Sequence, residues 1–312
     1  MLSRIADSLF WLNRYMERAD GMTRLIHVHY ILSMDKSMAA NSGWKSVLEI
    51  YTTFGDKRRE DIGQDMPIVL KQLLIDDNNP NSLQMIIRRA RENARGAQDQ
   101  LTKEVWEQVN QMYHMINDPS LKKRLNTNEA MSIIEGFSKE TVVFAGITDI
   151  TMERGLGWNF MNLGKFIERC MQTIAILGKE LELVKDNPAE TNDVLQWRYL
   201  LLCLSGYEMH LKNYRNQHHE KNVMHQVLLN ENFPHSVIYS LTRINYYLEN
   251  IRSIHEEDNR SLVRNFGSLF SKVKYMDLEA FNTRLIHDFL LQLGTDLGEF
   301  TRDLSQYYFN YS

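Results

Sequence analysis

The sequence has few of the residues that interrupt helices or cross-link a chain. Its 312 residues include only 5 prolines, 15 glycines and 2 cysteines. With so few helix breakers, long stretches can stay helical, and the abundant Leu, Met, Glu, Lys, Arg and Gln favour helix. Cys170 and Cys203 cannot form a disulfide framework, and both stand in apolar helical patterns where a free thiol packs as a small hydrophobic group. We therefore expect an all-α chain in a reducing compartment.

The sequence also lacks a strong net charge and a long hydrophobic run. Its 36 basic and 40 acidic residues leave a net charge of −4, which gives no long-range attraction to nucleic acid. The first 20 residues mix acids and bases among apolar residues, unlike a signal peptide. Apolar runs such as Tyr199–Leu204 are far shorter than the roughly 20 residues of a membrane span. We expect no nucleic acid partner, no membrane association and a cytoplasmic location.

The strongest periodicity lies near the N-terminus. Mostly apolar residues recur there at alternating steps of four and three, which is typical of a long helix that packs along one face. The stripe consists of Ile5, Leu9, Leu12, Met16, Ala19, Thr23, Ile26 and Tyr30. A second stripe in the same register follows 151 positions later, at Leu156, Phe160, Leu163, Ile167, Cys170, Ile174, Leu177 and Leu181. The two long helices thus share one pattern.

Two further features recur in the same order and indicate an internal repeat. Trp44 recurs as Trp197, and the helix start PNSL at 80–83 recurs as PHSV at 234–237. We expect an all-α helical bundle of two diverged four-helix-type repeats related by a pseudo-twofold axis. Its parts are a first repeat over 1–126, a linking helical segment over 127–154 and a second repeat over 155–312. The pattern predicts late helices over about 101–116, 128–151 and 278–309, and no strand.

Each long helix carries a Glu-Arg dipeptide, at Glu17-Arg18 and at Glu168-Arg169. Adjacent helical residues point about 100° apart, so each glutamate needs a partner other than its neighbouring arginine. A basic residue stands three positions before each glutamate, whereas neither arginine has an acid at helical spacing and both stand among apolar and aromatic residues. We therefore expect buried arginines that need a partner from another segment.

Two interpretations of these arginines are open. In the structural one, each arginine pairs with the glutamate of the other copy, Arg18 with Glu168 and Arg169 with Glu17, and the pairs fix the register of the bundle. In the functional one, at least one guanidinium binds a carboxylate or phosphate of a ligand. Trp11 and Tyr15, close to Arg18, then help to form the site.

A second charged cluster stands in the first half only, over 88–110, and its counterpart at 241–252 is mostly aromatic and amide. Helical ion-pair spacing predicts contacts of Arg88 with Glu92, of Glu92 with Arg95 and of Arg95 with Asp99. Arg91 has no acid at such a spacing. The candidate ligand-binding residues are therefore Arg18, Arg169, Arg91, Glu92, Arg95, Trp11 and Tyr15.

Familiar catalytic and metal motifs are missing. None of the 10 histidines follows a glutamate at the spacing of a di-iron bundle, and the cluster of His218, His219, Glu220 and His225 is not a zinc-protease motif. We expect no metal and no cofactor, and catalytic residues are unknown. The candidates for a general base are Glu17, Glu168 and Glu153, if burial raises their pKa, but no partner nucleophile stands near them.

Three segments carry a family resemblance: MLSRIADSLFWLNRYMERAD at 1–20, RENARGAQDQLTKEVWEQVN at 91–110 and TMERGLGWNFMNLGKFIERC at 151–170. They resemble the Alpha-E family, a predicted α-helical domain named for its Glu-Arg motif, across essentially the whole chain. Gln98 and Cys170 depart from the Arg and Ala that are commoner there. The resemblance implies neighbours or fusion partners of the circularly permuted ATP-grasp and transglutaminase-like types.

Three functions follow as hypotheses. The resemblance implies an accessory subunit or peptide-binding platform for an ATP-grasp type ligase or a transglutaminase-like protein, with Arg18, Arg169 and Arg91 as anion contacts. The alternative is an enzyme of peptide or amide bonds, in which the glutamates act as acid or base and the arginines hold a substrate carboxylate. In the third, every charge only stabilises the bundle.

Overall fold

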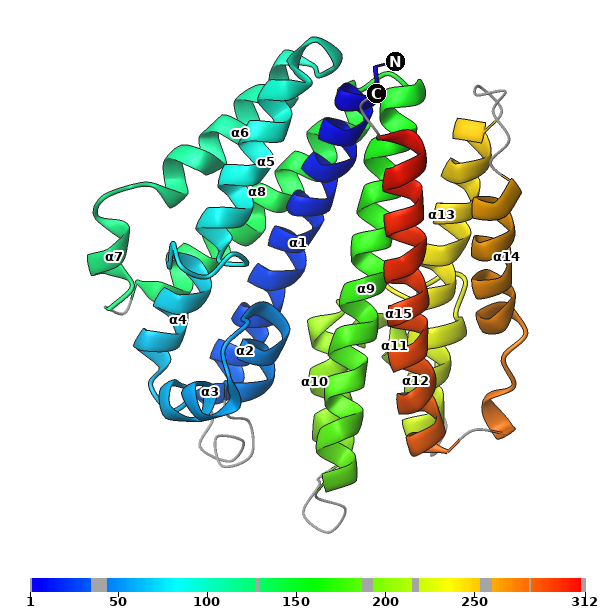
Figure 1. Ribbon diagram of the computed structural model, residues 1–312. Coiled ribbons are helices and arrows are strands. Elements are labelled where there is room, and N and C mark those ends of the chain that lie inside the picture. The colour runs from blue at the N-terminus through cyan, green and yellow to red at the C-terminus, as the bar shows by residue number, and fades with distance from the viewer. Residues whose placement is uncertain are drawn as a thin grey trace. The chain divides into compact units, whose positions relative to one another are not determined.

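The computed structural model describes residues 2–34, 44–126, 129–186, 193–214, 219–252, 260–280 and 282–309 (Figure 1). Among these residues every regular element is a helix and no strand occurs, which confirms the predicted all-α class. The chain forms two compact units. Unit 1 comprises Met1–Phe10 and Gly155–Ser312, and unit 2 comprises Trp11–Arg154. The first helix, α1 (Ser3–Ser33), begins in unit 1 and continues in unit 2.

In unit 2, α1 is followed by short helices and by three longer ones, α5, α6 and α8. α5 packs against α6, and α6 packs against α8, while α2, α3 and α4 contact one another. Side-chain caps fix the starts of α4, α5 and α6, where Asp65, Ser82 and Thr102 each accept from the backbone N–H three residues on. The elements are α2 (Lys45–Tyr51), α3 (Asp56–Ile62), α4 (Met66–Leu74), α5 (Leu83–Gly96), η1 (Gln98–Gln100), α6 (Lys103–Ile116), α7 (Leu121–Arg124) and α8 (Ala130–Thr151). The helices expected over 101–116 and 128–151 are α6 and α8.

Unit 1 is built on the second long helix, α9. Both α13 and the C-terminal helix α15 pack along α9, and α14 packs on α13 and α15 (Figure 1). α12 contacts α10 and α13. The elements are α9 (Leu156–Asp186), α10 (Asp193–Cys203), α11 (Tyr207–Asn213), α12 (His219–Leu229), α13 (Val237–Arg252), α14 (Arg260–Lys274), η2 (Leu278–Ala280) and α15 (Thr283–Tyr308). The helix expected over 278–309 is thus a 3₁₀ turn followed by α15, which begins after the N-cap Asn282.

Both heptad stripes lie in the core. Their first members, Ile5 and Leu156, are half-buried, and every later member of each stripe is buried. Burial of these apolar side chains is the main stabilising contribution to each unit, at roughly 1.5–3 kcal/mol for each large one. The alternating steps of four and three therefore identified the packed faces of α1 and α9 correctly.

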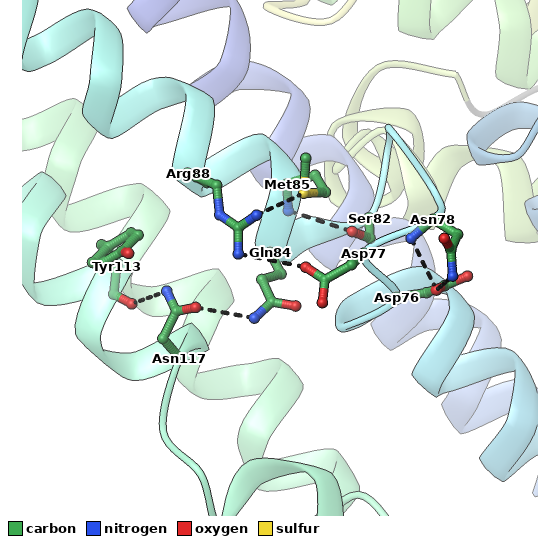
Figure 2. A network of polar contacts seen from close by, with 9 residues as sticks. All are labelled: Asp76, Asp77, Asn78, Ser82, Gln84, Met85, Arg88, Tyr113 and Asn117. Carbon is green, nitrogen blue, oxygen red and sulfur yellow. Dashed lines mark hydrogen bonds and ion pairs between the residues drawn. The ribbon is translucent and has the colours of Figure 1, made fainter.

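The turn before α5 is held by its own side chains (Figure 2). Asp76 Oδ1 accepts from the backbone N–H of Asn78 at 3.1 Å, and Ser82 Oγ accepts from the backbone N–H of Met85 at 3.3 Å. The first contact is an Asx turn and the second is a helix N-cap. Together they fix the direction in which the chain enters α5.

The turn before α13 repeats this pattern in unit 1. Asn230 Oδ1 accepts from the backbone N–H of Asn232 at 2.9 Å, and Ser236 Oγ accepts from that of Tyr239 at 3.0 Å. In both turns the capping serine also donates its backbone N–H to the carbonyl three residues earlier. The sequence similarity of 80–83 and 234–237 thus corresponds to the same local structure.

Candidate functional site

The Glu-Arg dipeptide of α1 contacts the turn before α5, within unit 2. Arg18 Nη1 donates to Asn81 Oδ1 at 3.3 Å, and the Arg18 guanidinium lies 5.9 Å from the centre of the Tyr15 ring. Asn81 directly precedes the capping Ser82, so Arg18 holds α1 against the start of α5. The neighbouring Glu17 is buried.

The dipeptide of α9 makes the corresponding contact within unit 1. Arg169 Nη1 donates to the carbonyl oxygen of Pro234 at 3.4 Å, and its guanidinium lies 5.2 Å from the centre of the Phe166 ring. Thr173 adds a 2.9 Å hydrogen bond to the carbonyl oxygen of His235. In each unit, therefore, the arginine of the dipeptide binds the turn that opens a packed helix.

The burial of the dipeptides differs from the expectation. Glu17 is 7% exposed and Glu168 is 3% exposed, whereas Arg18 and Arg169 are only half-buried. Arg18 and Arg169 are thus less buried than expected, because the long side chains reach from the helix to a surface turn and keep part of the charge in water. Glu153, the third candidate base, is exposed beyond the end of α8.

Trp11 and Tyr15 form an aromatic pair on α1. Their ring centres are 5.5 Å apart, and the Arg14 guanidinium lies 4.7 Å from the centre of the Trp11 ring. Both rings are half-buried. Of the predicted ligand-binding residues, Trp11, Tyr15 and Arg18 are thus neighbours on one stretch of α1.

Arg91 belongs to the α5–α6 contact. Its Nε donates to Asn110 Oδ1 at 2.7 Å, and its guanidinium lies 4.5 Å from the centre of the Tyr113 ring and 5.8 Å from that of Trp106. Its Nη1 is 3.8 Å from a carboxylate oxygen of Glu92. This agrees with the absence of an acid at helical spacing, because the acidic neighbour of the half-buried Arg91 side chain is the residue next to it in the sequence.

Of the three ion pairs expected along α5, the described residues contain only Glu92 with Arg95, at 3.9 Å. Arg88 instead lies 3.4 Å from Asp77, in the turn before the helix, and donates to Met85 Sδ at 3.5 Å (Figure 2). The tertiary partner replaces the one expected at helical spacing. Arg91, Glu92 and Arg95 are therefore grouped on α5, while Arg169 lies on α9 in unit 1.

Two groups outside the predicted set have unusual surroundings. Arg243 on α13 lies among three aromatic rings, those of Phe166, Tyr246 and Tyr247. Glu180 on α9 is buried, and burial raises its pKa to about 8, although a hydrogen bond with Gln196 acts in the opposite direction. Arg243 could have been found through the repeat, since it stands 154 positions after Arg89.

The structure offers no metal centre among the residues it describes, since no three or more His, Cys, Asp or Glu side chains there could share an ion. His218 and the side chain of His219 lie outside those residues, and His225 Nδ1 lies 2.8 Å from the hydroxyl of Tyr214. No helix in the described ranges is both long and apolar enough to cross a membrane.

Comparisons with known proteins agree with the Glu-Arg pattern. A family model described as a predicted alpha-helical domain with a conserved ER motif matches residues 1–309. Uncharacterized proteins of Mycobacterium bovis and of Mycobacterium tuberculosis are 25% identical over 266 residues, which cover 80% of this chain and 30% of the relative. The chain thus spans about a third of the length of these relatives. No solved structure matches it.

Proposed function

The chain belongs to the Alpha-E family, and from this premise we propose that it is an accessory helical subunit or peptide-binding platform. It works with an ATP-grasp type ligase, a transglutaminase-like protein or both, in a system that forms or modifies peptide or amide bonds. It is not independently catalytic. The relatives support this role, because in them the matched region is joined to further sequence that makes up most of the protein.

The proposal rests mainly on the burial and the contacts of the two Glu-Arg dipeptides. Each glutamate is buried in a packed helix, while each arginine is half-buried against a surface turn. A general acid or base has to come within hydrogen-bond reach of its substrate. Buried carboxylates with surface-reaching guanidinium groups fit anion recognition better than proton transfer, which disfavours the enzyme alternative.

We also propose that the two units descend from one four-helix-type repeat and that the repeats are related by a pseudo-twofold axis. The support is the shared stripe, the two Asx turns with their serine caps, and the equivalent contacts of Arg18 and Arg169. The reciprocal pairing of Arg18 with Glu168 and of Arg169 with Glu17 stays a prediction. Two buried free thiols support the proposed cytoplasmic setting.

Co-expression with an ATP-grasp type protein from the same organism tests the function. We expect a complex on size-exclusion chromatography, and ADP release with amine and carboxylate substrates that rises when the chain is present. Arg18→Met and Arg169→Met should weaken the complex or its response to substrate, whereas Arg302→Met, which removes an exposed charge on α15, should not. Hydrolysis or ligation of peptides by the purified chain alone would favour the enzyme instead.

A further inference from the structure

Arg243 is an arginine enclosed by aromatic rings in unit 1. Its guanidinium lies 5.1 Å from the centre of the Tyr247 ring, 5.2 Å from that of Tyr246 and 5.7 Å from that of Phe166. Its Nη2 donates to the hydroxyl of Tyr247 at 2.8 Å. Aromatic faces attract a cation, but they do not neutralise its charge.

The hydrogen-bonding capacity of this guanidinium is only partly used. Arg243 Nε is buried and has no hydrogen-bond partner. Nη1 makes no hydrogen bond to a described residue and does not belong to the buried side-chain atoms that lack a partner, so it is open to solvent. No carboxylate of the described residues lies within ion-pair distance of Arg243. A half-buried cation without a counter-ion is costly, and an anion at its open edge would offset part of that cost.

The equivalent arginine of unit 2, Arg89, contacts the turn before its helix. Arg89 donates from Nη1 to the carbonyl oxygen of Pro80 at 3.2 Å. In unit 1 the corresponding carbonyl, that of Pro234, accepts from Arg169 instead. Arg243 therefore makes no hydrogen bond to this turn and contacts the aromatic rings instead.

Two of the aromatic rings around Arg243 are buried and the third is exposed. Phe166 and Tyr247 are buried and stack at 5.9 Å with an interplanar angle of 16°, while Tyr246 is 52% exposed. Two more cations lie over the same Phe166 ring, Lys165 Nζ at 5.8 Å and Arg169 Cζ at 5.2 Å. The cluster thus presents positive charge beside an apolar, aromatic surface.

We propose that this cluster binds the carboxylate of a ligand that carries an apolar or aromatic group next to it. Arg243 Nη1 donates to a carboxylate oxygen, and the apolar part of the ligand lies against Tyr246. A planar carboxylate suits the planar guanidinium, and the aromatic walls favour an apolar body over a fully hydrated phosphate ion. All residues of this site lie in unit 1, so the chain alone binds the ligand, whether or not it also serves as an accessory subunit.

Binding of 4-fluorobenzoate to the full chain, followed by ¹⁹F NMR, tests the proposal. We expect saturable broadening with the parent protein, and affinity lower by about tenfold for Arg243→Met, which removes a charge-assisted hydrogen bond. Arg252→Met is the matched control, because it removes an exposed charge from the same helix, and its affinity should stay within about twofold of the parent. Tyr246→Ala, a change at an exposed side chain, should weaken binding without unfolding the chain, even if Arg243→Met fails to fold.

Three results would overturn the proposal. Equal binding of 4-fluorobenzamide would show that the rings, and not the charge, attract the probe. Displacement of 4-fluorobenzoate by inorganic phosphate at a lower concentration than by benzoate would assign the site to phosphate. Parental affinity in both Arg243→Met and Tyr246→Ala would place the probe elsewhere on the chain.

Discussion

Arg91 and Asn110 join α5 to α6, with Arg91 Nε donating to Asn110 Oδ1 at 2.7 Å. The guanidinium also rests on the ring of Tyr113 and reaches the carboxylate of Glu92. A side chain with this many partners is held in one orientation. Its removal is therefore expected to weaken the packing of α5 on α6, independently of any effect on ligand binding. Arg91 therefore contributes to the stability of unit 2, whatever else it binds.

Arg91→Met should lower the free energy of unfolding by about 1–3 kcal/mol, because it removes a charge-assisted hydrogen bond and a cation–π contact and leaves Asn110 Oδ1 without this donor. Urea unfolding monitored by circular dichroism measures the change. The matched control is Arg95→Met on the same helix, where the side chain is 66% exposed and contacts the same Glu92. That control should change stability by less than about 0.5 kcal/mol. Equal effects of the two substitutions would contradict the structural role of Arg91.

The contact of Arg18 with Asn81 predicts energetic coupling between α1 and the start of α5. Arg18→Met and Asn81→Ala should each destabilise the chain by about 1 kcal/mol, and together by less than the sum, since each alone already breaks the same hydrogen bond. A double-mutant cycle from urea unfolding at one pH gives the coupling energy.

The control for that cycle is Arg18→Met combined with Asn78→Ala. Asn78 lies in the same turn but contacts Asp76. Its effect should add to that of Arg18→Met within about 0.5 kcal/mol. Strict additivity of the Arg18 and Asn81 substitutions would mean that the 3.3 Å contact contributes nothing to stability.

Periodicity alone predicted the elements that matter most to the fold. The steps of four and three residues identified the buried faces of α1 and α9, and the helix predicted over 101–116 begins within two residues of the start of α6. Such features are local, since a helix face and a helix start are determined by neighbours within a few residues. The final helix was placed too early because its N-cap, Asn282, was not recognised.

The partners of the charged residues were harder to predict, because they come from tertiary packing. Helical spacing paired Arg88 with Glu92, but the turn before α5 brings Asp77 closer. Arg91 has no acid at helical spacing, yet its principal partner, Asn110, lies on another helix. Arg243 was missed because its significance lies in the rings that three-dimensional packing gathers around it.

Cys170 and Cys203 should be inert toward thiol reagents in the folded chain. Both are buried, and burial raises the pKa of Cys170 to about 12, so little thiolate exists near neutral pH. Labelling with Ellman's reagent should be slow in native buffer and should reach both thiols in urea. Ser268→Cys, at an exposed position of α14, supplies a thiol that should react at once. Rapid reaction of the parent chain without denaturant would contradict the burial of these two residues.

Glu180 makes the stability of the chain depend on pH in an unusual direction. Burial raises its pKa from 4.5 to about 8, and Oε2 has no hydrogen-bond partner. Above pH 4.5 the unfolded chain loses this proton while the folded chain keeps it, so the unfolded state binds fewer protons. The contribution of Glu180 to the free energy of unfolding is therefore complete at low pH, falls as the pH rises, and stops falling near the folded-state pKa of about 8.

Glu180→Gln should remove this dependence, because the amide does not titrate and keeps nearly the same volume. Urea unfolding at several values between about pH 5 and about pH 8 should show a flatter profile for Glu180→Gln than for the parent. At the upper end the variant should be more stable by on the order of 1–3 kcal/mol. Glu208→Gln, at an exposed position in the same unit, controls for the change in net charge and should follow the parent profile. Parallel profiles for the parent and Glu180→Gln would mean that the carboxyl has the same pKa in the folded and the unfolded chain. Water would then have to reach the Glu180 carboxyl in the folded chain.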